Sequence, residues 1–319
     1  TRLVSDWSSD VCSSDLLWQR IFNDPETGRR RLDRPELPTW VRLALAAGVL
    51  VLGLYLITSG WALMISLGNR AFLEGVIITF YFAVGSIPLQ LALGLLLAYA
   101  LFQKIRGKEL YRMIFFLPYI TPAVAAATIF RIIFSARETS LANQFVGAFG
   151  IAPQRWIGEP RPFVNTIFGL NLEGFLAGPS QALVAVILLG IWMYVGYNAV
   201  IFLAGLGGIP HDLYEAARVD GASEWHLFRY ITLPLISPIT FYLSILGFIG
   251  TFQAFNTLYV MRTPFAQNTM DTVSIVIFDT FYKASRYGEA TAQAILLLLI
   301  ILAITQFQRS VLEKRVFYG

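Results

Sequence analysis

Six segments of this chain are apolar over at least the length that a helix needs to cross a bilayer, about 20 residues. They are Trp40–Leu67, Gly75–Phe102, Tyr111–Phe134, Gln181–Gly207, Pro234–Met261 and Ala290–Val311. Only 14% of the 319 residues are charged, against about 25% in a soluble globular domain. The chain therefore cannot cover itself with a polar surface. The sequence predicts an all-α membrane protein with six transmembrane helices, multi-pass and in contact with membrane lipid.

Lysine and arginine gather in the connections that would share one side of the membrane if the spans alternate. Those residues are Arg29, Arg30, Arg31, Arg34, Lys104, Arg106, Lys108, Arg112, Arg218, Arg229, Arg309, Lys314 and Arg315. Short cytoplasmic loops collect basic residues, so we expect both termini and loop 209–233 to be cytoplasmic and loop 135–180 to be extracytoplasmic. Because the basic residues are scattered at span edges, the net charge of +4 does not indicate a nucleic-acid partner.

The first 16 residues have a composition unlike the rest. The run from Asp6 to Leu16, which contains the single cysteine Cys12, resembles the translation of a sequencing adapter. We interpret residues 1–16 as a non-native, adapter-like segment, with a genuine polar N-terminus as the alternative. Residues 17–39 would then form a cytoplasmic N-terminal segment, and residues 40–67 the first transmembrane helix. Residues 313–319 would form a cytoplasmic tail.

Prolines are frequent within the predicted spans. Each removes a backbone donor and tends to kink a helix, and neighbouring helices can compensate for the loss. The kinks are either a matter of shape or hinges near a translocation path, and the sequence leaves both open. The residues are Pro88, Pro118, Pro122, Pro234 and Pro238.

A polar stretch, Leu213–Ala222, separates the fourth and fifth spans and predicts a short helix. Asp212 is a candidate N-cap, Gly221 supplies the turn after the helix, and Pro234 would begin the fifth span. Small residues on this helix allow a partner to approach closely. From the residues alone, a helix lying on the membrane surface fits equally well.

Signatures of catalysis are absent from the sequence. There is no Gly-x-x-x-x-Gly-Lys-Ser/Thr loop for ATP phosphates and no His-Glu-x-x-His metal motif. The two histidines, His211 and His226, fall in the predicted cytoplasmic loop. The spans hold no charge near their centres, apart from Arg131 toward one end, whereas an ion-coupled carrier would more often keep a buried carboxylate there. We expect a non-catalytic chain that holds no cofactor of its own.

The stretch from Glu215 to Ala222 reads EAARVDGA, and Phe228, Ile231, Pro234 and Pro238 follow it at fixed spacing. This register resembles the EAA loop of the membrane subunits of bacterial ABC importers. The resemblance implies the type I ABC importer permease fold, with a core of five transmembrane helices over 72–312 and the coupling loop at 209–233. It implies that this helix docks in a partner ATPase, which binds ATP and Mg. The implied contact residues are Glu215, Ala216, Ala217, Asp220, Gly221 and Ala222.

Further stretches resemble carbohydrate-uptake permeases, the family of the maltose and glycerol-3-phosphate permeases. They are Tyr111–Pro118, Phe248–Asn256 with its continuation to Gly288, and Glu313–Gly319. The resemblance places sugar contacts at Gly190, Met193, Tyr194, Tyr197, Gly247, Gly250 and Thr251. Gln253 and Asn256 add hydrogen-bonding groups, and polar residues within a bilayer tend to face a cavity or a partner helix. The alternative is that Tyr194, Tyr197, Gln253 and Asn256 only bridge helices. Glycine or Thr251 stands where the maltose subunit has polar residues.

Together these patterns predict a permease subunit of a binding-protein-dependent ABC sugar importer in the bacterial inner membrane. Its expected partners are a second homologous permease, two copies of a cytoplasmic ATPase and an extracytoplasmic solute-binding protein. The alternatives are a permease for another small solute such as glycerol-3-phosphate, a stand-alone channel or ion-coupled carrier, and a membrane-embedded enzyme. The sequence does not name the sugar.

Overall fold

The computed structural model describes residues 69–103, 106–172 and 177–312, all within the unit Leu67–Gly319. These residues form helices joined by loops, and the only β-type pairing among them is one isolated bridge between Pro162 and Ser180. The all-α prediction is therefore confirmed for this part of the chain. The predicted segments 1–16, 17–39, 40–67 and 313–319 lie outside the described residues.

Three described helices are long and apolar enough to cross a membrane. They are α4 (Arg70–Phe102), α9 (Gln181–Gly207) and α17 (Tyr287–Leu312), and they coincide with three of the predicted spans. At about 1.5 Å per residue, even the shortest exceeds the thickness of the hydrocarbon core, about 30 Å. The start of α9 is fixed by Ser180, whose side chain accepts a hydrogen bond from the Leu183 amide at 3.1 Å.

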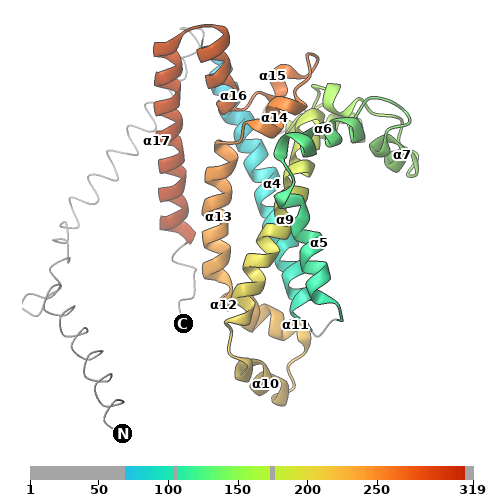
Figure 1. Cartoon of the computed structure of the whole chain (residues 1–319), viewed down its shortest axis with the longest axis vertical. Helices are drawn as coiled ribbons and strands as arrows, with labels where there is room; N and C mark the ends of the chain where they lie inside the picture. Colours follow the sequence, from blue (N-terminus) through green and yellow to red (C-terminus); the bar gives the residue numbers. More distant parts are fainter. Residues whose placement is uncertain (1–68, 104–105, 173–176, 313–319) are drawn as a thin grey trace, which may run out of the picture. The chain divides into compact units, whose positions relative to one another are not determined.

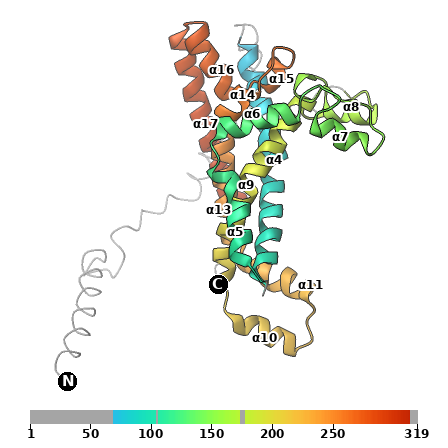
Figure 2. The ribbon, with the colours of Figure 1, turned by 45° about the vertical axis from the view of Figure 1, so that its right-hand side comes forward.

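The predicted span Tyr111–Phe134 is wrong as one continuous helix. It divides into α5 (Lys108–Ile120) and α6 (Ala123–Ile133), which meet at an angle of 93°. Pro122 causes the break, because proline cannot donate a helical hydrogen bond and forces the preceding residue into an extended conformation. Thr121 has that conformation, with φ −63° and ψ 133°. Figure 2 shows α6 turned away from the direction of α5.

The predicted span Pro234–Met261 is also divided. A helical stretch begins earlier, as α11 (Glu224–Leu227), and continues through a π-helical segment (Phe228–Thr232) into α12 (Leu233–Leu235). It is bent by 61° from α13 (Ser237–Phe252). The helix therefore does not begin at Pro234.

A second break, over residues 253–255, separates α13 from α14 (Asn256–Met261). Counting each bent pair as one span, the described residues supply up to five spans.

Shorter elements complete the end of the molecule where α6 lies. They are α7 (Leu141–Gly147), the 3-10 turn η2 (Trp156–Gly158), α8 (Phe163–Phe168), α15 (Gln267–Met270), α16 (Val273–Phe278) and a π-helical segment η5 (Asp279–Lys283). The loop expected over 135–180 therefore contains short helices, among them α8, which begins at Phe163. At the opposite end of α9 lie α10 (His211–Val219) and α11 (Figure 1).

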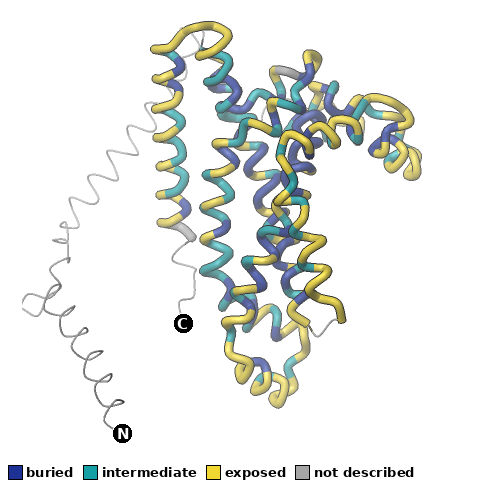
Figure 3. Tube along the Cα trace, viewed as in Figure 1, coloured by how far each residue is buried: buried dark blue, intermediate teal, exposed yellow. Residues whose placement is uncertain are grey.

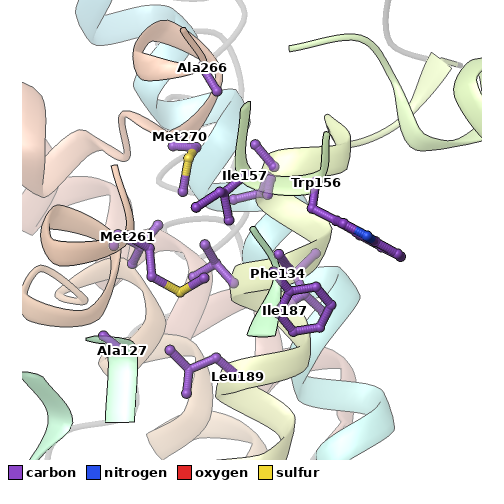
Figure 4. Close-up of a cluster of buried hydrophobic side chains, with 14 of the residues drawn as sticks. Ala127, Phe134, Trp156, Ile157, Ile187, Leu189, Met261, Ala266 and Met270 are labelled. Carbon is purple, nitrogen blue, oxygen red and sulfur yellow. The ribbon is translucent and has the colours of Figure 1, made fainter. Parts of the chain in front are cut away.

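The packing is organised around α9. Half of its most apolar stretch is buried, against 11% for α17, and Figure 3 shows the same contrast along the two helices. One apolar cluster surrounds the end of α9 near α6 and α14, and includes Trp156, Ile187 and Met261 (Figure 4). A second, with Phe202, Leu206 and Ile236, packs the other end. These two clusters fix α4 and α13 against α9, and α5 also packs along α9.

At Gly196 the backbones of α5 and α9 approach each other closely. A Cβ atom placed there would lie 1.7 Å from the backbone oxygen of Phe115, so no larger residue fits while the helices remain where they are. The lack of a side chain at this one position therefore sets the spacing of the two helices.

We expect Gly196→Ala to destabilise the protein by about 3 kcal/mol or more, at or above the usual cost of overpacking, because the obstacle is backbone rather than a movable side chain. Gly207→Ala is the matched control on the same helix, where an added Cβ meets nothing within 4 Å, and it should change stability by at most about 1 kcal/mol. Thermal unfolding of the purified protein in detergent measures both. Equal melting temperatures for the two variants would show that α5 and α9 do not pack as described.

Candidate functional site

A cavity of about 290 Å³ lies between α4, α9, α13 and the link to α14. Aromatic rings and uncharged polar groups line it, and none of the described residues in this lining is charged. Part of the wall comes from the break after α13, where residues 253–255 leave the helix. Its lining is Phe82, Ser86, Gln90, Ala123, Gly190, Met193, Tyr194, Leu246, Gly247, Gly250, Thr251, Gln253, Ala254, Phe255, Asn256 and Thr257.

Eight of the nine residues predicted to contact cargo line this one cavity. They come from α9 (Gly190, Met193, Tyr194), from α13 (Gly247, Gly250, Thr251) and from the region of the break (Gln253, Asn256). The ninth, Tyr197, lines a neighbouring cavity of about 150 Å³, which Tyr194 and Gly247 also line. The structure thus brings together residues that are up to 66 positions apart in the sequence, Gly190 and Asn256.

The two tyrosines of α9 also pack against α5. The ring of Tyr197 stacks on that of Tyr119 with centroids 4.5 Å apart, and Tyr194 meets Tyr119 edge-on at 5.8 Å. Tyr197 is half-buried, whereas Tyr194 remains 44% exposed. The contact with Tyr119 fits the helix-bridging alternative for Tyr197. Tyr194 both joins the cluster and faces the cavity.

Helix α4 contributes Phe82, Ser86 and Gln90 to the cavity, and none of the three was predicted as a site residue. The signal was available, because Ser86 and Gln90 are polar residues on either side of Pro88 in an otherwise apolar segment. Polar residues within membrane helices tend to face a cavity or a partner.

An ion-pair network holds the segment that follows α14. The guanidinium of Arg262 contacts Asp271 at 2.8 Å and Asp279 at 2.7 Å, and Lys283 contacts Asp279 at 2.8 Å. The side chains of Arg262 and Asp271 are only 10% and 15% exposed. Burial raises the pKa of Asp271 to about 6, and the neighbouring Asp279 adds to the rise while Arg262 opposes it. The network ties the loop before α16 to the end of α14.

The predicted polar helix is found at the opposite end of α9 as α10. Its N-cap is Pro210 rather than Asp212, which lies in the first turn. That part of the prediction is wrong, because Pro210 supplies the extended residue before the helix two positions earlier than expected. The prediction of a turn at Gly221 is confirmed, since this residue has φ +81°, a conformation that glycine adopts without steric cost.

The residues predicted to contact a partner lie on the outer side of this end. Glu215, Ala216, Asp220 and Gly221 are exposed, and Ala217 and Ala222 are half-buried. A shallow groove of about 390 Å³ between α10 and α11 is lined by Ala217, Asp220, Gly221, Ala222, His226, Leu227, Tyr230 and Ile231.

Two features of the α10–α11 region were not predicted. Arg218 pairs with Glu224 of α11 at 3.1 Å, so its charge is partly used inside the chain. Three large apolar or aromatic residues flank the groove in exposed positions: Val219 (88%), Trp225 (68%) and Tyr230 (72%). Exposed apolar groups gathered in this way are typical of a protein interface.

Tyr214 connects α10 to the body of the molecule. Its ring is buried, and its hydroxyl hydrogen-bonds the hydroxyl of Thr232 at 3.1 Å. Thr232 is fully buried in the π-helical segment and also donates to the Leu227 carbonyl at 3.4 Å. The α10 helix is therefore joined to the stretch that leads into α13, which in turn lines the cavity.

Comparisons with known proteins agree with this arrangement. The family described as binding-protein-dependent transport system inner membrane component matches residues 90–318. The arabinooligosaccharide transport permease of Bacillus subtilis is 31% identical over 71% of this chain and 66% of its own length. The trehalose/maltose transport permease of Thermococcus litoralis is 28% identical over 75% of this chain and 74% of its own length.

The fold also occurs among solved structures. One of them is a bacterial ABC transporter involved in the import of the acidic polysaccharide alginate, and it matches with a TM-score of 0.65 over 98% of this chain and 99% of the solved chain. The sequences are 20% identical, so this likeness concerns the fold alone.

The buried carboxyl of Asp271 predicts a dependence of stability on pH. Its pKa in the folded protein, about 6, lies above the ordinary value of 3.8. A raised carboxyl pKa favours folding while the group is protonated, so this contribution is present below about pH 4 and is lost as the pH rises through about 6. Between pH 5 and pH 7, unfolding by denaturant should show a larger loss of stability for the native protein than for Asp271→Asn, which stays neutral throughout. Parallel profiles would contradict the assignment.

The Tyr214–Thr232 hydrogen bond predicts a measurable coupling between α10 and the π-helical segment. Tyr214→Phe and Thr232→Val should each destabilise by about 1 kcal/mol, and the double variant should lose less than the sum because both remove the same bond. Hydrogen–deuterium exchange of α10 should be faster in each variant. Tyr230→Phe is the control at an exposed tyrosine of the same segment, and it should change neither quantity. Strictly additive losses would mean that the two hydroxyls do not interact.

Proposed function

We propose that this chain, which belongs to the family of binding-protein-dependent transport system inner membrane components, is the permease subunit of an ATP-driven sugar importer. In this role it forms half of a translocation path for a sugar or oligosaccharide. The observation that carries the proposal is the uncharged cavity, because its rings can stack on sugar faces and its amides and hydroxyls can bind sugar hydroxyls. The two relatives described above are transport permeases for oligosaccharides or disaccharides.

The alternative of an ion-coupled carrier has less support. Acidic residues in the three long described helices lie near their ends, at Glu74 of α4 and Glu289 of α17. A carrier driven by ions would be expected to place a carboxylate deeper, where it could bind the ion. A permease for glycerol-3-phosphate stays the closer alternative, and the cargo test below separates it from a sugar permease.

The driving energy would come from a partner. We place the docking site of a cytoplasmic ATPase, which binds ATP and Mg, at α10, with Glu215 and Gly221 as anchors and Ala216, Ala217, Asp220 and Ala222 along the contact. The exposed Val219, Trp225 and Tyr230 support an interface there. This chain would be non-catalytic, and two ATPase copies would serve it together with a second permease.

The same role predicts how the chain is oriented in the membrane and which partner meets each end. The α10–α11 end and both termini would face the cytoplasm across a bacterial inner membrane, as the distribution of lysine and arginine indicates. The end that carries α7, α8 and α15 would then meet a solute-binding protein that delivers the sugar. Uncharged oligosaccharides fit this cavity chemically better than the acidic polysaccharide carried by the structural neighbour.

The proposal is tested on the complete transporter in membrane vesicles, supplied with the solute-binding protein and MgATP. Glu215→Lys should reduce the uptake of labelled sugar at least tenfold and weaken ATPase binding, since reversed charge at an interface can cost several kcal/mol. Glu215→Gln, which removes the charge without reversing it, is the control and should lose less. Neither change touches a span, so both variants should insert normally.

Gly221→Arg should have the same effect as Glu215→Lys, but its cause needs a separate control. Because Gly221 has φ +81°, any side chain strains the turn as well as meeting the partner. Gly221→Asn tests the strain alone, since asparagine tolerates this conformation better than most residues. Normal transport by Glu215→Lys and Gly221→Arg with the ATPase still attached would overturn the proposed docking site.

A further inference from the structure

Gln90 lies in α4 as a buried amide without a partner. Its side chain is only 7% exposed, and it forms no hydrogen bond with another residue of the described part of the chain. Other buried glutamines there are paired through their amide nitrogens, although not through their side-chain oxygens: Gln181 donates to Gln154 at 3.2 Å and Gln308 to Ser244 at 3.4 Å. Buried polar groups are nearly always hydrogen-bonded, so an unpaired one points to a ligand or water that completes it.

The amide lies where two cavities meet. Gln90 lines both the cavity of about 290 Å³ and the neighbouring one of about 150 Å³. Gly190 of α9 stands opposite, and a Cβ added there would lie 3.6 Å from Nε2 of Gln90 and 3.6 Å from the ring of Phe82. Because Gly190 has no side chain, the amide faces open space rather than a packed wall.

The neighbouring hydroxyls already have partners. Ser86 donates to the Phe82 carbonyl at 2.6 Å and Thr251 to the Gly247 carbonyl at 2.8 Å. A glutamine amide offers two donors and one acceptor oxygen, and here all of them are free. Among the buried polar groups that line the larger cavity, the amide of Gln90 therefore has the greatest unused capacity for hydrogen bonds.

The surroundings also determine the charge of what can bind. Within the described part of the chain, no lysine, arginine, histidine, aspartate or glutamate lines either cavity. The nearby cations are engaged elsewhere: Arg131 donates to the Val260 carbonyl at 3.3 Å, and Arg262 pairs with two carboxylates. A phosphate or carboxylate entering this space would lose its water without gaining an opposite charge, which is costly.

We propose that Gln90 binds the hydroxyls of a neutral sugar unit at the junction of the two cavities, and that this site selects uncharged, polyhydroxylated cargo over anionic cargo. The inference rests on the proposed function and adds to it a binding residue and a substrate class. Phe82 beside the amide and Tyr194 across the cavity supply apolar ring faces for the sugar.

The first test uses the complete transporter in proteoliposomes with its solute-binding protein and MgATP. Labelled arabinotriose, maltose and trehalose serve as neutral probes, and glycerol-3-phosphate and an alginate oligosaccharide as anionic ones. Gln90→Leu should weaken the apparent affinity for the neutral cargo about tenfold, which corresponds to 1.4 kcal/mol. Gln90→Met, longer and more adaptable, should do the same if Gln90→Leu folds poorly. Gln308→Leu, a paired glutamine outside both cavities, should leave the affinity unchanged.

The second test measures directly whether cargo occupies the space beside residue 90. In a Cys12→Ser background, Gln90→Cys should react with a maleimide in the assembled transporter, and the neutral cargo should protect it while the anionic probes do not. A purely structural role for Gln90 would give no protection by cargo.

The outcomes separate the two proposals. Unchanged sugar affinity in both Gln90→Leu and Gln90→Met would overturn the binding role. Equal uptake of anionic and neutral probes by the native transporter would overturn the selectivity while leaving ATP-driven import intact. If the native complex drives no uptake with ATP, the proposed function fails, and this inference with it.

Discussion

A broken helix within a bilayer has to satisfy its freed backbone groups inside the protein, because the hydrocarbon offers no water. The break after α13 meets this constraint through α16. The carbonyl of Phe252 accepts a hydrogen bond from Ser274 at 2.9 Å, and that of Ala254 accepts one from Thr272 at 3.5 Å. The Arg262–Asp271–Asp279 network then holds the loop that carries these hydroxyls. The irregular wall of the cavity exists because neighbouring side chains replace the missing helical bonds.

The parts of the fold that sequence predicts well are those set by composition and length. The segment 181–207 is apolar throughout and lacks proline, and the structure has a single helix with those limits. The segments 111–134 and 234–261 are equally apolar, but hydropathy does not register where the chain turns. Pro122 and the bend at Ile236 divide them. Pro88 lies inside α4, which is one element, so proline alone does not decide between a kink and a break. The outcome depends on which neighbours can satisfy the backbone.

The residues of the site also divide into those that the sequence predicts and those that only the structure reveals. Similarity to a family supplied Gly190, Tyr194 and Thr251, and the fold places them around one cavity. It did not supply Gln90, because a polar residue in an apolar helix can face either a cavity or a partner helix, and only the structure shows that Gln90 lines the cavity. The Asp271 carboxyl was missed for a related reason, since its burial arises from packing of the loop around Arg262 and not from any local pattern.

The two ends of the molecule are joined by one continuous set of contacts. Tyr214 fixes α10 to Thr232, and Thr232 belongs to the stretch from Glu224 to Leu235, which meets α13 at an angle of 61°. Beyond that angle α13 is a single helix that carries Gly247, Gly250 and Thr251 to the cavity. A displacement of α10 would therefore reach the cavity wall through a hydrogen bond and one joint at Ile236. A joint of this kind between rigid elements is how a small shift at one site becomes a rotation at another. The same bend that interrupts the predicted span thus gives the α10 end a mechanical route to the cavity.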